Sequence, residues 1–302
     1  MTALVGFIPS PSSGVLKLGS LTIHLYGVTL LVAILLCIWL TVIRWKKLGG
    51  DSDFVIRVAV WGVAFGIIGA RAYHDITSWN EVPTPKWKGI FEIWQGGLGI
   101  WGGILLGTLA GVVIIRRAGY SALTFMDVAA PGMLLAQGIG RIGNWWNQEL
   151  YGKPTTLPWG LEINLAHRAG IAPQYLNAKA YQPTFLYELL WDLAGVGLLL
   201  LVERRTKLYP PALFALYVAY YCFGRFFEEL LRIDPSHYWL GLRLNAWVSI
   251  VSFAAATGFF IWWQLLGRAD PERRPPPRKP RRVEPPAGPQ MAIPRGRVRP
   301  RR

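Results

Sequence analysis

Seven stretches of this sequence are long enough and apolar enough to cross a lipid bilayer as helices, which takes about 20 residues each. The first is the clearest, because no charged residue occurs between Tyr26 and Ile43. Only 16% of all residues are charged, against roughly 25% in soluble domains. We therefore expect an all-α, polytopic membrane protein with seven transmembrane helices. The expected spans lie near 25–43, 56–74, 97–115, 122–143, 184–202, 211–228 and 245–267.

The distribution of Lys and Arg between the loops predicts how these spans are oriented. Three short loops, 44–55, 116–121 and 203–210, together hold eight basic residues, whereas the other side carries eight over about 100 positions. Short loops rich in Lys and Arg stay on the cytoplasmic side. The N-terminus is then expected outside and the C-terminus in the cytoplasm, which requires an odd number of spans.

Two domains are expected on the basis of composition. Residues 1–267 form the membrane domain, with an outside loop at 144–183 that is rich in Asn, Pro and Trp. Residues 268–302 hold twelve Lys and Arg, three Asp and Glu and ten Pro, which predicts a disordered cytoplasmic tail lying against anionic membrane lipids. This tail accounts for much of the net charge of +15. With no recognisable base-reading motif, the charge does not indicate a nucleic-acid partner.

Polar residues of the spans gather at their outer ends, with Asp127 and Asp192 as the exceptions. Taken singly, such residues are typical of the membrane interface. Taken together, they show helical spacing that places an arginine and a second polar residue on one face, as at Arg225 and Glu229. The arginine fork suits phosphate oxygens, so the pattern favours a site for a lipid phosphate. The outer-end residues are Tyr26, Arg71, His74, Arg141, Asn144, Glu188, Arg225 and Glu229.

Two other functions fit seven packed spans less well. A transporter needs polar residues along a path and often shows repeated halves, neither of which is apparent. An intramembrane protease needs a serine, zinc or paired-aspartate motif, and none occurs. The two cysteines, Cys37 and Cys222, lie inside apolar runs and are expected to be small buried hydrophobic residues. We expect neither a metal nor a cofactor.

One segment, Gly140-Arg141-Ile142-Gly143-Asn144-Trp145-Trp146-Asn147-Gln148-Glu149-Leu150-Tyr151-Gly152, closely resembles the signature of the prolipoprotein diacylglyceryl transferase family. The resemblance extends over most of residues 20–250. The further matching motifs are His24-Leu25-Tyr26-Gly27, Gly69-Ala70-Arg71, Trp94-Gln95-Gly96-Gly97-Leu98, Pro183-Thr184-Phe185-Leu186-Tyr187-Glu188, and Gly224-Arg225 with Glu229 and Arg232.

This resemblance implies a multi-pass transferase of the bacterial inner membrane that acts on two substrates. Such enzymes move the sn-1,2-diacylglyceryl group of phosphatidylglycerol to the thiol of the lipobox cysteine of a prolipoprotein. A thioether forms and glycerol phosphate leaves, in the first step of lipoprotein maturation. The expected partners are therefore phosphatidylglycerol, prolipoproteins and membrane lipids.

The resemblance also implies roles for nine residues. Arg141 is expected to bind the phosphatidylglycerol headgroup, and Arg141 and Arg225 to neutralise the departing phosphate. Either Glu149 or Glu229 orients an arginine, and Tyr26 either positions the headgroup or relays a proton. The expected catalytic residues are Tyr26, Arg141, Asn144, Glu149, Arg225 and Glu229, and the expected substrate-binding residues are Arg141, Gly97, Gly152 and Arg71.

One position departs from the family pattern. Many members have a histidine before the second Gly-Gly pair, where this sequence has Trp101 before Gly102-Gly103. An indole cannot accept a proton. Either another group deprotonates the acceptor thiol or that histidine is not a universal base, and His24 is one substitute.

Overall fold

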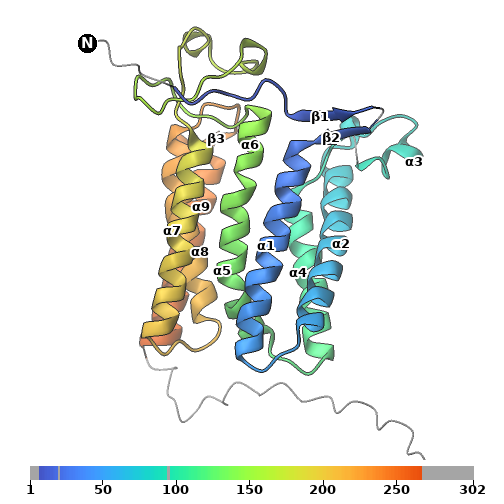
Figure 1. Cartoon of the computed structure of the whole chain (residues 1–302), viewed down its shortest axis with the longest axis vertical. Coiled ribbons are helices and arrows are strands. Elements are labelled where there is room, and N and C mark those ends of the chain that lie inside the picture. Colours follow the sequence, from blue (N-terminus) through green and yellow to red (C-terminus); the bar gives the residue numbers. More distant parts are fainter. Residues whose placement is uncertain (1–6, 20, 94–95, 267–302) are drawn as a thin grey trace, which may run out of the picture.

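The computed structural model describes residues 7–19, 21–93 and 96–266. Long helices run along one axis, with short strands and a long loop at one end (Figure 1). The long helices are α1 (Leu25–Lys47), α2 (Ser52–Thr77), α4 (Ile100–Arg117), α5 (Ala122–Gly140), α7 (Thr184–Arg205), α8 (Ala212–Leu231) and α9 (Leu244–Phe260). The shorter helical elements are η1 (Trp79–Glu81), α3 (Lys86–Gly89), α6 (Ile142–Asn147), η3 (Leu165–His167), η4 (Pro173–Tyr175) and the π-helical η5 (Ile261–Leu265).

Two small antiparallel hairpins lie at the loop-bearing end, one directly before α1 and one between α8 and α9. The strands β1 (Val15–Leu18) and β2 (Leu21–His24) pair with Val15 opposite His24 and lead directly into α1. The strands β3 (Tyr238–Trp239) and β4 (Leu242–Arg243) pair between α8 and α9. We call this end, which also carries the loop 148–183, the site end.

Six helical spans in the described part of the chain are long and apolar enough to cross a membrane. Many of their large apolar side chains face outward, for example Leu31 at 56% exposure and Leu105 at 69%. An apolar surface of this extent suits contact with lipid tails rather than with water. The multi-pass membrane architecture is therefore confirmed. The expected sixth span, 211–228, forms α8, which is 20 residues long and differs from the six because it carries Arg225, Glu228 and Glu229.

Small residues let α2 and α4 approach closely, as the spacings Gly62-x-x-x-Gly66 and Gly103-x-x-x-Gly107 predict. A Cβ atom at Gly66 would lie 3.6 Å from the carbonyl oxygen of Gly103. At Gly69 it would lie only 2.3 Å from the carbonyl oxygen of Gly102. A side chain at Gly69 would thus force the two helices apart, and the expected backbone approach is confirmed.

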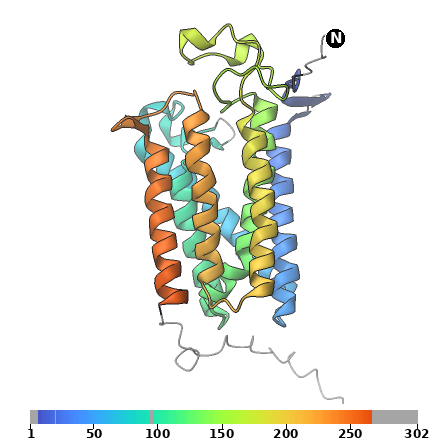
Figure 2. The same cartoon turned by 90° about the vertical axis from the view of Figure 1, so that its left-hand side faces the viewer.

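The helix α5 is central to the bundle, with α1 on one side and α7 and α8 on the other (Figures 1 and 2). Aromatic and branched residues of α1, α2, α4 and α5 form one core at the end opposite the site end. A second core lies where α5 meets α7 and α8. The buried members of these two cores are Trp45, Phe54, Val55, Val58, Ile115, Ala122, Phe125 and Val128, and Ala130, Leu134, Leu199, Leu213 and Tyr217.

The expected outside loop begins inside α6 and then forms a small structured unit. Tyr151, Leu161, Ile163 and Tyr181 make a buried core of their own, and the Arg168 guanidinium lies 5.1 Å above the Tyr181 ring. This loop covers the bundle at the site end. The expected disordered tail, 268–302, lies outside the described residues.

Candidate functional site

Arg141 occupies the junction between α5 and α6. Its backbone stays helical (φ −64°, ψ −23°), so α6 continues nearly in line with α5 until Gln148 ends it with a left-handed φ of 53°. Asn144 therefore follows Arg141 by one turn, and Arg141 Nη1 donates to Asn144 Oδ1 at 3.5 Å. Asn144 Nδ2 in turn donates to Glu149 Oε1 at 2.9 Å. Within the signature segment, Glu149, Asn144 and Arg141 thus form one hydrogen-bonded chain.

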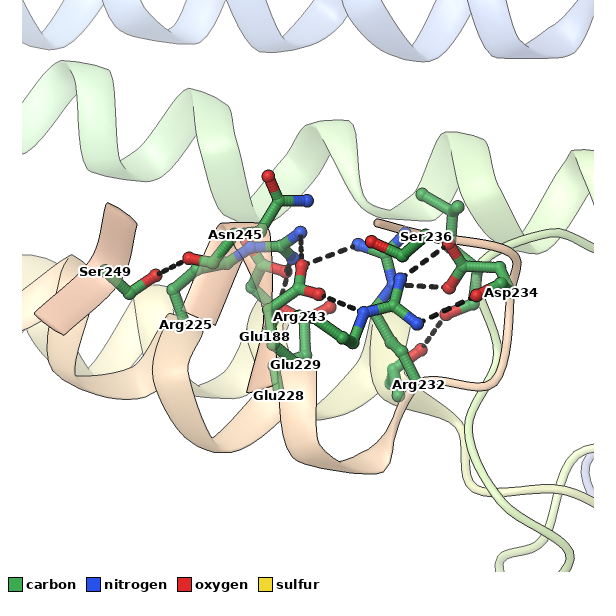
Figure 3. Close-up of polar contacts among 12 residues, drawn as sticks. Glu188, Arg225, Glu228, Glu229, Arg232, Asp234, Ser236, Arg243, Asn245 and Ser249 are labelled. Carbon is green, nitrogen blue, oxygen red and sulfur yellow. Dashed lines mark hydrogen bonds and ion pairs between the residues drawn. The ribbon is translucent and has the colours of Figure 1, made fainter. Parts of the chain in front are cut away.

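Glu188, one turn into α7, joins two arginines that come from different helices. Its Oε1 lies 2.6 Å from Nη2 of Arg141, and its Oε2 lies 3.2 Å from Nη1 of Arg225 on α8. Arg225 also pairs with Glu228 at 2.5 Å and with Glu229. Figure 3 shows Arg225 among these three carboxylates. The two arginines predicted to meet the phosphate therefore share one buried carboxylate.

Glu229 links this pair to the strand end that precedes α9. Its Oε1 accepts from Arg232 Nη1 at 3.2 Å, and its Oε2 accepts from Arg243 Nε at 2.7 Å. Both of these arginines also bond to Asp234, Arg232 through Nε at 2.7 Å and Arg243 through Nη2 at 2.8 Å. The polar network thus runs without a break from Glu149 to Asp234, as Figure 3 shows for its α8 and α9 part.

At the outer limit of this network, the arginines dominate the electrostatics. Burial raises the pKa of Asp234, but hydrogen bonds and charge from Arg232 and Arg243 outweigh burial and hold that pKa below its ordinary value. Burial lowers the pKa of Arg243, and the charges of Asp234 and Glu229 more than reverse this. Glu188, Glu228, Glu229 and Asp234 each already pair with a guanidinium. The network is therefore suited to exchanging one anion for another rather than to holding a metal cation.

Tyr26 lies beside the signature segment, in the first turn of α1, which follows directly after β2. Its ring packs against the backbone of Gly143, and a Cβ atom at Gly143 would lie 2.7 Å from the Tyr26 Cδ2 atom. The absence of a side chain at position 143 is what lets the tyrosine approach Arg141 and Asn144 from the α1 side.

Arg71 is buried at the end of α2 and holds the loop that precedes α4. Its guanidinium donates to the carbonyl oxygens of Ile90 at 3.0 Å, Gly96 at 2.8 Å and Gly97 at 3.1 Å, and to that of Gly89. Gly97 has a φ of +74°, and a Cβ atom there would lie 2.5 Å from His74 Nε2. The structure thus gives both residues a part in shaping this loop, while their expected contact with lipid stays a prediction.

Gly152 brings the signature segment against the end of α8. It forms an antiparallel bridge with Arg232, and its N–H donates to the Gln182 carbonyl at 2.9 Å. A Cβ atom would lie 2.8 Å from the Cβ of Gln182 and 3.1 Å from the Leu231 carbonyl oxygen. Gly152 therefore permits the contact between the loop and the helix that carries Arg225.

Five of the six expected catalytic residues belong to the continuous network, and Tyr26 lies beside it. The sequence assigned no role to Glu188, Glu228, Tyr221 or Arg243, although Glu188 was placed at a span end and in a family motif. Tyr221 lies 3.4 Å from Arg141 Nη2. The only sequence signal for Glu228, Tyr221 and Arg243 was their position toward the outer ends of spans, which ordinary interfacial residues share.

Two cavities adjoin the network. One, of about 230 Å³, lies between α7 and α8 and is lined by Tyr187, Glu188, Trp191, Gly224, Phe227, Glu228 and Leu231. The other, of about 250 Å³, lies above the signature segment and is lined in part by Glu149, His167 and Asp234. Trp101, in the first turn of α4, is 54% exposed. Cys222 is buried, as expected, whereas Cys37 is only half-buried.

Comparison with known proteins gives a consistent result. A protein from Paenarthrobacter aurescens is 46% identical over 266 residues, covering 84% of this chain and 83% of the relative. One from Cutibacterium acnes is 46% identical over 278 residues, covering 91% and 93%, and one from Bifidobacterium adolescentis is 43% identical over 276 residues, covering 88% and 82%. All three are named phosphatidylglycerol–prolipoprotein diacylglyceryl transferase. The profile of the prolipoprotein diacylglyceryl transferase family matches residues 13–262, and the chain belongs to that family of transferases.

Proposed function

We propose that this chain transfers the sn-1,2-diacylglyceryl group of phosphatidylglycerol to the lipobox cysteine thiol of prolipoproteins. The sulfur forms a thioether, and glycerol phosphate leaves. The names of the relatives support both substrates. The observation that carries the proposal is the pairing of Arg141 and Arg225 through Glu188, because it places two guanidinium forks, from two elements, around one anion position.

Departure of glycerol phosphate adds negative charge to the phosphate oxygens. Preorganised donors aimed at developing charge lower a barrier more than donors that bind substrate and transition state equally. Asn144 holds Arg141 and Glu229 holds Arg225 before substrate arrives, so little reorganisation of the two guanidiniums is needed. Glu229 orients Arg225 directly. Glu149 acts one step away, since it holds Asn144, which contacts Arg141.

The remaining expected residues act on the substrates' position. Tyr26 faces the signature segment from α1, where its hydroxyl suits either headgroup binding or proton relay. Gly152 allows the signature loop to pack against the end of α8. Arg71 and Gly97 shape the connection between α2 and α4, and this connection contacts the lipid.

The topology that goes with this activity has seven spans, with α8 as the sixth. The packing of α8 along α9 and α7 in the bundle supports this count. The N-terminus is outside and the C-terminus in the cytoplasm, because Arg44, Arg116 and Arg204 all lie at the end opposite the site end. The network then faces the outer leaflet of the bacterial inner membrane, where an exported acceptor arrives. The basic segment 268–302 would face anionic lipids on the cytoplasmic side.

The direct test is mass gain on a lipobox-cysteine peptide incubated with the purified protein and phosphatidylglycerol. The native protein should add one diacylglyceryl group, and Arg141→Ala should lose at least a hundredfold in kcat/KM, the cost of removing a transition-state donor. Arg116→Ala, an exposed arginine at the opposite end of α4, is the matched control and should keep native activity. Full activity in Arg141→Ala would remove this arginine from the mechanism.

A further inference from the structure

Glu188 occupies the anion position that the proposed reaction needs for phosphate. We propose that Glu188 is the group that accepts the proton of the acceptor thiol, and that arrival of the lipid phosphate frees it to do so. This inference rests on the proposed function and names a catalytic residue for it. It also answers the question raised by Trp101, whose indole cannot accept a proton.

The first support is the competition at the two arginines. Glu188 places one oxygen 2.6 Å from Arg141 and the other 3.2 Å from Arg225. A phosphate that engages the same two guanidiniums has to displace these contacts, at least in part. The carboxylate is only 5% exposed, so water does not replace the lost partners. A buried carboxylate without a counter-ion takes up a proton readily.

The second support is the cavity between α7 and α8. Its wall is mostly apolar, from Trp191, Phe227 and Leu231, and its carboxyl groups are Glu188 and Glu228. The volume of about 230 Å³ is several times the roughly 30 Å³ of one water molecule, which leaves room for a cysteine side chain. A thiol that enters there meets a carboxylate adjacent to the proposed phosphate position.

Glu188 suits this role better than its acidic neighbours. Glu228 and Glu229 contact Arg225 but not Arg141, so binding of phosphate across both arginines affects Glu188 most directly. Asp192, one turn deeper on the same face of α7, is fully buried and neither oxygen has a hydrogen-bond partner. An ionised carboxylate in that setting is very costly, so Asp192 holds its own proton.

The chemical step balances without any further reactant. The thiol proton passes to a Glu188 oxygen while sulfur bonds to the glycerol carbon of the diacylglyceryl group. The bond between that carbon and the phosphate oxygen breaks, and glycerol phosphate leaves with the electron pair. Proton return to solvent restores the carboxylate, which can pair with Arg141 and Arg225 again once the product leaves.

The test compares the pH profile of transfer in Glu188→Gln with that of the native protein. The groups that face Glu188 are Arg141 from the α5–α6 junction, Tyr221, Arg225 and Glu228 from α8, and Asp192 on α7. Without its base the variant depends on free thiolate, whose ordinary pKa is about 8.5. Its kcat/KM should be at least a hundredfold lower at pH 7 and rise about tenfold per pH unit up to pH 8, while the native profile stays nearly flat.

Two further readouts separate this role from a structural one. Glutamine does not compete as an anion for the arginines, so KM for phosphatidylglycerol should stay the same or fall while kcat falls. Asp192→Asn, the matched control, should keep the native rate and profile. A Glu188→Gln variant with native kcat, or one whose lower rate lacks the pH slope, overturns the proposal. The same holds if the slope appears in Asp192→Asn or Glu228→Gln instead.

Glu188→Asp covers the case in which the glutamine variant does not fold. Its shorter carboxylate should lower kcat at least tenfold and leave the profile flat, whereas an unchanged kcat argues against Glu188 as the base. The native protein is measured in the same assay. If it transfers no lipid, the proposed function fails, but if it transfers lipid and the Glu188 variants match it, only this inference fails.

Discussion

Glu229 accepts a hydrogen bond from Nε of Arg243 at 2.7 Å, which joins the last turn of α8 to the residue directly before α9. Its other oxygen faces Arg225 and Arg232. The carboxylate side chain is completely buried. One carboxylate thus pairs with three guanidiniums, and it holds both Arg225 and the connection between two helices in place.

Glu229→Gln should therefore lower both stability and activity. Removing one partner of a buried ion pair costs about 3–5 kcal/mol, because the remaining charges are left uncompensated. We expect a large drop in Tm in detergent and loss of transfer. Glu81→Gln is the matched control: Glu81 is an exposed carboxylate of η1, so its loss should cost about 0.5 kcal/mol or less. Equal Tm values for the two variants would contradict the structural role of Glu229.

The membrane architecture was predictable because lipid imposes a simple rule on sequence. Apolar runs that start at residues 25, 122 and 184 correspond to α1, α5 and α7, whose helices begin at Leu25, Ala122 and Thr184. The family motif likewise identified Arg141, Asn144 and Glu149, which lie together. These features depend on residues near one another in the chain.

The partners of those residues were not predictable in the same way. Glu188 contacts Arg141 and Arg225 only because α5, α7 and α8 meet at this depth, and helical spacing within one span does not show which spans are neighbours. Arg71 was expected to bind lipid, but its donors meet carbonyl groups of a loop about 20 residues farther along the chain. Such contacts depend on the irregular backbone at the site end.

Gly143 provides a test of the position of Tyr26. In Gly143→Ala the new Cβ would lie 2.7 Å from the Tyr26 ring, so the ring has to move away from the signature segment. We expect kcat/KM for transfer to fall at least tenfold, as misplacing a positioned group by about 1 Å does in other enzymes. In Gly140→Ala the nearest atom is 3.8 Å away, on Leu30, and activity should be retained. Native activity in Gly143→Ala would show that transfer does not require this packing.

Asp234 predicts an acid-sensitive connection between α8 and α9. Its pKa is below the ordinary value of about 3.9, so the unfolded state binds the proton more readily than the folded state. The stabilisation is present above that ordinary value and is lost as pH falls through the lower, folded value. Asp234→Asn should cost about 1 kcal/mol at pH 7, after allowance for partial exposure. The Tm difference from the native protein should shrink below pH 4, and a difference that does not change with pH would contradict this assignment.

Arg44 compensates for the backbone hydrogen-bond donor that Pro131 removes from α5. Proline has no N–H, so the carbonyl of Asp127, four residues earlier, lacks its helical donor. Arg44 Nη2 donates to this carbonyl oxygen at 3.0 Å, and its Nε donates to that of Val128 at 2.8 Å. Arg44 is only 6% exposed, so α1 supplies the donor where water does not reach the helix.

This relationship predicts a coupling between two substitutions at the end opposite the site. Arg44→Met should cost about 2–3 kcal/mol, because it leaves a buried carbonyl unpaired. In a Pro131→Ala background the helix supplies the missing N–H, so the same substitution should cost at least 1 kcal/mol less. Chemical denaturation of the four proteins in detergent gives the coupling, with transfer activity per folded molecule expected to stay near native in Arg44→Met. If the cost of Arg44→Met is the same in both backgrounds, Arg44 does not compensate for the donor that Pro131 lacks.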